Sequence, residues 1–330
     1  MKTAMYWHRE PSEGVQCDLC PHRCRIPEGR AGRCQIRRCV KGTLAASGYG
    51  FVSSAHLDPI EKKPLYHFFP GSAIFSIGGW GCNLACAFCQ NWSISQEAPE
   101  DGGRCEVADL LARARAEGSE CVAYTYNEPL INYEFVMGCC QQARSMGMRN
   151  VLVTNGFINR EPADELLPFV DAINLDIKSM DNRFYEEHCR GSLAPVLEFA
   201  RQAIGKGCHL EITNLVIPGL NDDSELLESM AQWISGNLGK TVPLHLSGYF
   251  PQYKMRVPAT PKAVLERGWE VCRKHLPYVY VGNVETGKGQ DTSCPGCGSL
   301  LIRRRGYRVE MVGLNSAACA HCGRTADIRR

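Results

Sequence analysis

The sequence predicts an α/β fold centred on a partial (β/α)6 barrel of the TIM type, open on one side. From residue 73 to about residue 282, short β-rich segments alternate with segments whose apolar residues recur at helical spacing. This alternation indicates parallel strands joined by helical crossovers, and six such units are fewer than the eight that close a full barrel. Cysteine clusters lie on both sides of this region. We therefore expect a cysteine-rich metal-binding arm (1–71), the barrel (72–289) and a zinc-ribbon-like module (290–330).

The elements of the barrel follow from the same pattern. Strands are expected at 73–77, 121–126, 151–154, 172–177, 209–216, 243–246 and 278–281. Helices are expected at 107–117, 131–146, 162–167, 195–205, 224–238 and 261–274. Ser224 is a suitable N-cap, and Pro162 and Pro261 suit a first helical turn. Because the chemistry of such folds lies at the carboxyl ends of the strands, the loops after the strands are where a site is expected.

The composition narrows the class of protein. The 330 residues are 44% apolar and 22% charged, and the net charge of +2 gives no general attraction to nucleic acid or membranes. No segment approaches the roughly 20 apolar residues of a membrane span, and the first residues lack the apolar core of a signal peptide. We therefore expect a cytoplasmic protein. In that compartment thiols stay reduced, so the 19 cysteines predict metal binding rather than disulfides.

The first cysteine group in the chain consists of Cys17, Cys20, Cys24 and Cys34, separated by two, three and nine residues. Four thiolates can hold a structural zinc ion or an auxiliary iron–sulfur cluster, and redox-active thiols are a third reading. His22 and Cys39 are spare ligands. The spacing alone leaves these alternatives open.

The most informative motif is Cys82-x3-Cys86-x2-Cys89, directly after the expected strand 73–77. A 4Fe–4S cluster usually takes four cysteine thiolates, so three leave one iron open. An open iron can chelate the amino and carboxylate groups of S-adenosylmethionine and pass it an electron, which yields methionine and a 5′-deoxyadenosyl radical. Three scattered thiols or part of a zinc site would be the plainer reading. Phe88 and the flanking glycines favour the cluster.

Polar residues follow the other strands, where core packing does not require them. They are Tyr126, Asn127 and Glu128, then Thr154 and Asn155, then Asn174, Asp176 and Lys178, then Glu211, Thr213 and Asn214, and finally His245. Each alone is most simply a cap or a turn. Alternate residues of a strand share one face, so Asn174, Asp176 and Lys178 would point together. Their convergence suggests a bound zwitterion and ribose.

The last cysteines are Cys294, Cys297, Cys319 and Cys322, two Cys-x2-Cys pairs joined by an expected hairpin over 300–312. Two such pairs make a zinc ribbon, and zinc is preferred over a rubredoxin-like iron because closed four-cysteine sites are ordinarily structural zinc. Arg303, Arg304, Arg305 and Arg308 would give this module a basic face. That face could contact RNA, although a solvated surface is the simpler reading.

The motifs together resemble a known family. The triad of cysteines with Phe88 resembles the radical S-adenosylmethionine (radical SAM) superfamily, in its pyruvate formate-lyase-activating-enzyme-like branch. The chain resembles the radical enzymes of the AmmeMemoRadiSam system over nearly its whole length. The segments that carry this resemblance are 17–24, 58–67, 89–92 and 124–129. By this resemblance, Asn127-Glu128-Pro129 replaces the Gly-Gly-Glu-Pro segment that holds the methionyl amino group.

The resemblance also implies roles and partners. Asn155, Asp176 and Lys178 would face the ribose and the methionyl carboxylate, and Phe88 would face the adenine. Companions of the Memo and AMMECR types are implied, together with an electron donor such as flavodoxin or ferredoxin.

Several functions fit these observations. The first is an activase-like oxidoreductase whose radical abstracts hydrogen from a protein, and the second is abstraction from a small molecule. A third is an RNA-modifying radical SAM enzyme that uses the basic ribbon. A redox sensor without catalysis is disfavoured, because sensing needs no open iron beside a polar pocket.

Overall fold

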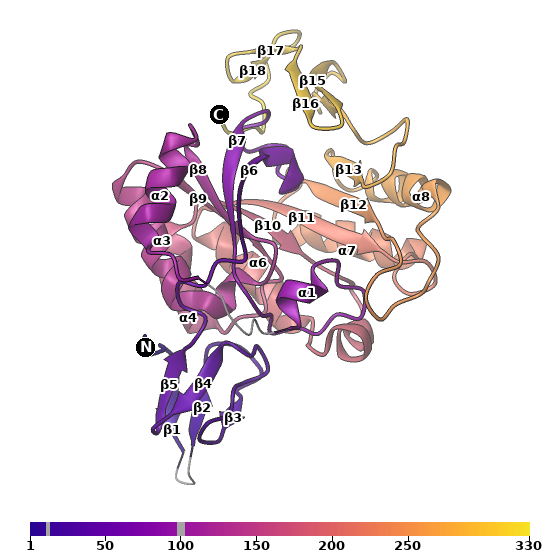
Figure 1. Ribbon diagram of the computed structural model, residues 1–330. Coiled ribbons are helices and arrows are strands. Elements are labelled where there is room, and N and C mark those ends of the chain that lie inside the picture. Colours follow the sequence, from indigo (N-terminus) through magenta and orange to yellow (C-terminus); the bar gives the residue numbers. More distant parts are fainter. Residues whose placement is uncertain (11–13, 98–102) are drawn as a thin grey trace.

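The structure is a computed structural model, and it describes residues 1–10, 14–97 and 103–330. Its centre is an eight-stranded sheet in the order β13-β12-β11-β10-β9-β8-β7-β6 (Figure 1). Strands β7 to β13 are parallel to one another, and β6 (Ser54–Pro59) pairs antiparallel with β7. The parallel strands are β7 (Ala73–Gly78), β8 (Cys121–Thr125), β9 (Arg149–Thr154), β10 (Ala172–Asp176), β11 (His209–Val216), β12 (Leu244–Gly248) and β13 (Val279–Gly282).

Helices connect successive parallel strands, as the alternation in the sequence predicts. They are α2 (Val107–Ala116), α3 (Tyr133–Ser145), α4 (Arg160–Leu166), α6 (Ala194–Gly205), α7 (Ser224–Asn237) and α8 (Lys262–Cys272). Their buried faces are apolar except for Glu134 of α3, and the strand residues beneath them are almost entirely buried. Shorter helical segments are α1 (Trp92–Ser95), α5 (Asn182–Phe184) and the turn η2 (Pro129–Asn132). The α/β class and the parallel sheet are confirmed, while closure toward a partial (β/α)6 barrel stays a prediction.

Two local expectations were wrong, and one strand was not foreseen. Strand β6 was not expected, because its sequence is polar and Leu57 is exposed, as an edge strand allows. The N-cap of α7 is Asp223 rather than Ser224, since the Asp223 carboxylate accepts from the backbone N–H groups of Glu225 and Leu226. Pro261 is the extended residue before α8 and not part of its first turn.

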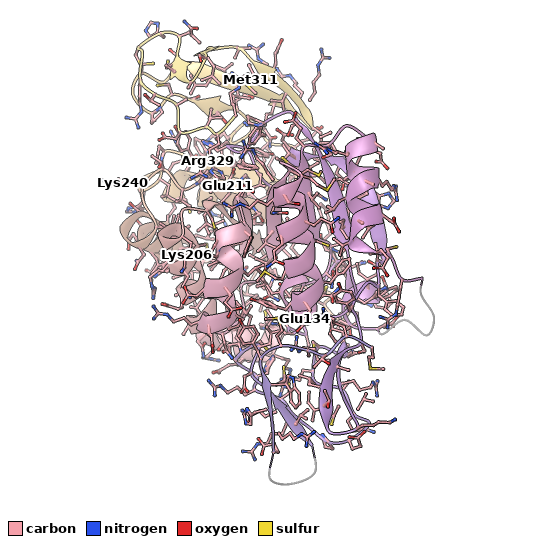
Figure 2. All side chains as sticks on the ribbon, turned by 90° about the vertical axis from the view of Figure 1, so that its left-hand side faces the viewer. Glu134, Lys206, Glu211, Lys240, Met311 and Arg329 are labelled. Atoms are coloured by element: carbon pink, nitrogen blue, oxygen red, sulfur yellow. The ribbon has the colours of Figure 1, made fainter. Side chains whose placement is uncertain are left out.

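The N-terminal arm folds into two small sheets below the main sheet (Figure 1). One contains β1 (Trp7–Arg9), β2 (Val15–Cys17) and β3 (Arg25–Ile26), and the other contains β4 (Arg37–Val40) and β5 (Thr43–Ala46). A buried ion pair ties the arm to α3, because Arg37 Nη1 lies 2.9 Å from Glu134 Oε1. The same oxygen accepts the backbone N–H of Met5 at 2.7 Å. Figure 2 shows Glu134 at this end of the molecule.

The C-terminal module lies at the opposite end of the sheet (Figures 1 and 2). It contains β14 (Thr292–Ser293), the hairpin of β15 (Leu300–Arg305) and β16 (Arg308–Met311), and the short pair β17 (Leu314–Asn315) and β18 (Ala318–Cys319). The chain end pairs with the segment after β6, since Arg329 exchanges backbone hydrogen bonds with His67 and Phe69. The expected hairpin is present as β15 and β16. The C-terminal module as a whole covers the amino ends of the parallel strands.

Arg304 attaches this module to the segment before β7 and does not contribute to a basic face. Its side chain is buried, donates to the carbonyl of Tyr66 at 2.7 Å and lies 4.2 Å above the Tyr66 ring. Arg303 pairs with Glu310 at 3.2 Å. Of the four arginines, only Arg303 has an ion pair among the described residues, and Arg305 and Arg308 are the two that stay exposed and unpaired.

No helix within the described residues is long and apolar enough to cross a membrane.

His67 is buried in the junction between the sheet and the C-terminal module. Its Nδ1–H donates to the carbonyl of Asp327 at 2.7 Å, and Nε2 lies 2.6 Å from the hydroxyl of Tyr280. Burial lowers the pKa of His67 to about 4, with Glu211 opposing and Arg304 adding to the shift. The native state therefore holds this imidazole neutral, while the unfolded chain protonates it near pH 6.5.

We expect stability to be lost as the pH falls from about 6.5 toward 4, because only the unfolded state takes up this proton. The loss from His67 between pH 7 and pH 5 should be about 2 kcal/mol. Anaerobic urea unfolding at the two pH values measures it. His67→Gln should show a smaller pH dependence by that amount. An identical pH dependence in both proteins would contradict the assignment. Loss of metal in acid cannot produce a difference between the two proteins, because it affects both alike.

Candidate functional site

The three-cysteine loop begins where β7 ends, at the carboxyl edge of the sheet. Asn127, just after β8, fixes its path: the side-chain oxygen accepts the N–H of Gly79 at 2.8 Å, and the side-chain nitrogen donates to the carbonyl of Gly81 at 3.0 Å. Gly81 has a positive φ of 80°, and a Cβ there would overlap the carbonyl oxygen of Cys34. Glycine is therefore required for the loop to pass beneath the arm.

Each of the three sulfurs has a hydrogen-bonding partner in the loop or beside it. The N–H of Leu84 donates to Cys82 Sγ at 3.3 Å, and the Ser95 hydroxyl lies 3.1 Å from Cys89 Sγ. The thiol of Cys189 beside Cys86 lowers the pKa of Cys86, against the effect of burial, whereas burial raises the pKa of Cys82 and Cys89. Donors directed at sulfur stabilise thiolates, which are the form that binds iron. The donor set therefore fits an iron–sulfur cluster.

Cys189 is a residue of the site that sequence reasoning missed, because it has no ligand spacing and was read as a packing residue. It ends the π-helical segment Tyr185–Cys189, whose carbonyls hold the cysteine loop. The N–H of Ala85 donates to the carbonyl of Cys189 at 2.8 Å, and that of Ala87 to His188 at 2.9 Å. No local pattern could have revealed this contact, since it joins residues about a hundred positions apart.

Glu128 lies at the end of β8, buried close to Cys82. Its Oε1 accepts the Thr154 hydroxyl at 2.6 Å and the N–H of Leu130 at 3.0 Å, and its Oε2 accepts the N–H of Asn155 at 2.8 Å. Burial raises the pKa of Glu128 to about 7, although these hydrogen bonds lower it. A carboxylate has about four acceptor positions, so one remains for a cationic ligand.

Asn155 connects Glu128 with the cysteine loop. Its side-chain nitrogen donates to Asn83 Oδ1 at 3.0 Å and lies 3.6 Å from Cys82 Sγ. Asn83, a second residue that the sequence reasoning missed, also donates to the carbonyl of Phe157 at 2.6 Å. Its position directly after Cys82 was the available signal. The ends of β7, β8 and β9 thus meet at one point.

The end of β10 supplies a charged pair to the same edge. Lys178 Nζ lies 3.2 Å from Asp176 Oδ2 and 5.9 Å from the centre of the Phe88 ring. Burial alone would lower the pKa of Lys178, but Asp176 and the thiols of Cys86 and Cys189 raise it well above its usual value. Phe88 is buried against Phe184, with ring centres 5.7 Å apart.

The structure does not bring Glu211 and His245 to this edge. Both lie in the amino-terminal halves of their strands, under the C-terminal module, where Figure 2 shows Glu211. The Glu211 carboxylate accepts from the backbone N–H groups of Tyr66 and His67, and lies 2.7 Å from His245 Nε2 and 2.9 Å from His209 Nε2. Although burial opposes it, these histidines hold the pKa of Glu211 well below its usual range. Its acceptor positions are therefore occupied within the protein.

The C-terminal cysteines form a compact group. The sulfurs of Cys294 and Cys322 are 3.6 Å apart, those of Cys297 and Cys319 are 3.7 Å apart, and all four lie within 4.8 Å of one another. A tetrahedral site with metal–sulfur bonds of about 2.3 Å has sulfurs about 3.8 Å apart. The group therefore fits a single tetrahedral metal ion.

The N-terminal cysteines lie next to the three-cysteine loop. Cys17, Cys20, Cys24 and Cys34 line one cavity together with Asn83. His22 Nε2 is 2.7 Å from the carbonyl oxygen of Asn83, so this nitrogen is not a spare ligand. Cys39 donates to Glu28 at 3.3 Å and does not line the cavity.

Comparisons with known proteins agree with this geometry. Residues 77–231 match the sequence model of the Radical SAM superfamily. The chain is 40% identical to the uncharacterized protein MJ0808 of Methanocaldococcus jannaschii, over 99% of both chains. It is 28% identical to the pyruvate formate-lyase 1-activating enzyme of Escherichia coli, over 51% of this chain and 72% of that one. A radical SAM methyltransferase from Sphaerobacter thermophilus shares the fold, with a TM-score of 0.52 and 18% identity over 65% and 67% of the chains.

Proposed function

The chain belongs to the radical SAM superfamily, in the branch that resembles the pyruvate formate-lyase-activating enzymes, and we propose that Cys82, Cys86 and Cys89 hold its catalytic 4Fe–4S cluster. The observation that carries this proposal is the contact of Asn155 with both Cys82 and Glu128, which places the cysteine loop beside a buried carboxylate. When bound, such a cluster supplies the electron that cleaves S-adenosylmethionine to methionine and a 5′-deoxyadenosyl radical.

The residues of the chain would bind and orient S-adenosylmethionine. Glu128 would accept from its ammonium group by a charge-assisted hydrogen bond, which stabilises the ionised carboxylate. Lys178 supplies a positive charge for the methionyl carboxylate, while Asp176 suits the hydroxyls of the ribose. Phe88 stands near Lys178 as a candidate for the adenine contact. Asn127 acts indirectly here, because both ends of its amide hold the backbone of the cysteine loop.

The radical would abstract hydrogen from a protein or a small molecule, as an activase-like oxidoreductase. The likeness to an activating enzyme supports a protein substrate. The chemistry requires a one-electron donor such as flavodoxin or ferredoxin, and proteins of the Memo and AMMECR types are proposed companions from the resemblance of the motifs.

RNA modification receives little support from the arrangement of the ribbon. Arg304 is buried and Arg303 is paired, so the basic face is smaller than the sequence suggested. The module also lies at the end of the sheet opposite the cysteine loop (Figure 1).

The expected outcome of replacing Cys82, Cys86 and Cys89 together by Ala is loss of dithionite-dependent 5′-deoxyadenosine formation, because no thiolate remains to hold the cluster. The product is measured anaerobically by chromatography. Cys272→Ala, a buried thiol that donates to the carbonyl of Leu227, is the control and should keep the activity. Product formation by the triple variant would refute the assignment.

Glu128→Gln should weaken S-adenosylmethionine binding by about tenfold or more, since a charge-assisted hydrogen bond is worth about 1.5–3 kcal/mol. Calorimetry on the reconstituted protein measures the affinity, and iron content should be unchanged. Thr154→Val is a matched control, because it removes a hydrogen bond to Glu128 but keeps the carboxylate. Equal affinities for wild type and Glu128→Gln would remove Glu128 from the site.

We also propose that Cys294, Cys297, Cys319 and Cys322 bind structural zinc. Replacing Cys294 and Cys319 by Ser should lower the zinc content by about one ion per chain and leave iron unchanged, because one closed site is lost. Metal analysis by mass spectrometry measures both elements. Loss of one iron instead would identify a rubredoxin-like centre. Cys208→Ala, a buried thiol outside all three groups, serves as the control.

A further inference from the structure

We infer that Cys17, Cys20, Cys24 and Cys34 hold a second iron–sulfur cluster, located beside the loop of the proposed catalytic cluster. The assignment of a second cluster rests on the cavity around these four cysteines, while its place beside a catalytic cluster rests on the proposed function. It decides among the three readings that the spacing left open, namely zinc, a cluster and redox thiols.

The separation of the sulfurs argues against a single metal ion. The four side chains line one cavity, yet among the described residues no three of their sulfurs lie within 4.8 Å of one another. In the C-terminal module the four sulfurs meet that distance, with pairs at 3.6 and 3.7 Å. The sulfurs of Cys82, Cys86 and Cys89, whose surroundings fit a cluster, also do not all lie within 4.8 Å of one another. The N-terminal group thus resembles the cluster loop rather than the ion site.

A buried cation in the wall of the cavity suits an anionic occupant. Arg37 is 1% exposed, lines the cavity and has no hydrogen-bond partner at Nε among the described residues. Its Nη1 pairs with Glu134, whose Oε2 is also without a partner. Four thiolates around a 4Fe–4S core of charge 2+ carry a net charge of 2−. The charge of Arg37 is already paired with Glu134, so its contribution is the Nε–H, which is left to donate to a sulfur. A zinc ion with four thiolates also carries 2−, so the choice of a cluster rests on the separation of the sulfurs.

The remaining wall has an apolar part, beside the polar residues His22, Arg33 and Asn83. Leu19, Ile26 and Ile131 line the cavity, and Ile131 comes from η2, after β8 of the main sheet, rather than from the arm. Few of the thiols are accessible, since Cys17, Cys20 and Cys34 are buried and only Cys24 is partly exposed. Thiols that exchange disulfides with a partner must be reachable, so burial disfavours the redox-thiol reading.

The cavity also adjoins the radical site. Asn83, which follows Cys82, lines it, and the carbonyl of Asn83 accepts from His22. The carbonyl of Cys34 lies against Gly81, on the other side of Cys82. The two clusters would therefore be neighbours, separated by the backbone of a single loop.

The test uses the full chain with Cys82, Cys86 and Cys89 replaced by Ala, reconstituted anaerobically with iron and sulfide. This protein should keep about four iron and four sulfide per chain, half of the wild-type content, with Mössbauer parameters of a four-iron cluster. Failure of the proposed function leaves this result unaffected, because the catalytic ligands are already absent. Adding Cys20→Ala and Cys24→Ala should remove the remaining iron and sulfide.

Cys39→Ala in the same triple background is the matched control, because Cys39 is a buried thiol of the arm outside the cavity. It should keep the second cluster. Zinc should stay at about one ion per chain throughout, from the C-terminal module. Two zinc ions per chain without sulfide, or no metal beyond that one zinc, would overturn the inference. Circular dichroism verifies that each variant is folded.

Electron paramagnetic resonance tests the position of the cluster. The reduced wild type should give a spectrum broadened by coupling between two neighbouring paramagnets. It should differ from the sum of the spectra of two variants, one lacking Cys82, Cys86 and Cys89 and the other lacking Cys20 and Cys24. A wild-type spectrum equal to that sum would show that the clusters are not neighbours.

Discussion

The hydrogen bonds of Asn155 are the constraint on which the site depends. Its backbone N–H holds Glu128 at the end of β8, and its side chain holds Asn83 and contacts Cys82 beyond β7. These groups come from three neighbouring strands, so the register of the parallel sheet sets their separation. Buried polar groups need partners, and here each serves as the partner of another. The cysteine loop is thereby attached to the carboxylate proposed to bind the ammonium group of the substrate.

The two ends of the sheet have different roles. At the carboxyl end, Arg37 and Glu134 fix the N-terminal arm above the cysteine loop. At the amino end, Glu211 and Arg304 fix the segment 64–68 and the C-terminal module. Removing one partner of the buried Arg37–Glu134 pair leaves an uncompensated charge, which costs about 3–5 kcal/mol. The buried polar residues of the sheet therefore form two sets. Those at the carboxyl end are proposed to bind the cofactors, and those at the amino end hold the C-terminal module in place.

The three cysteine groups differ in geometry although their spacings look alike. The C-terminal sulfurs converge to the distances of a tetrahedral ion, while the sulfurs of the other two groups stay apart. The hydrogen bonds differ as well: the sulfurs of Cys82, Cys86 and Cys89 face N–H, hydroxyl and thiol donors, and the N-terminal group faces the guanidinium of Arg37. The separation of the sulfurs thus distinguishes sites that ligand counts treat as equal.

Local sequence determined the features that depend on neighbours along the chain. Alternating periodicities predicted the parallel strands and their helices, and short cysteine spacings predicted all three groups, because a few residues of chain fix what their side chains can reach. Glu128, Asn155, Asp176 and Lys178 were proposed as site residues because they end or follow strands. Tertiary structure alone decided the roles of Cys189, Arg304, Glu211 and His245. Their partners lie tens to hundreds of residues away in the sequence, and alternation along a strand does not tell which end of the sheet a polar residue faces. Burial of Arg304 and saturation of Glu211 are properties of the packed molecule, which no local pattern contains.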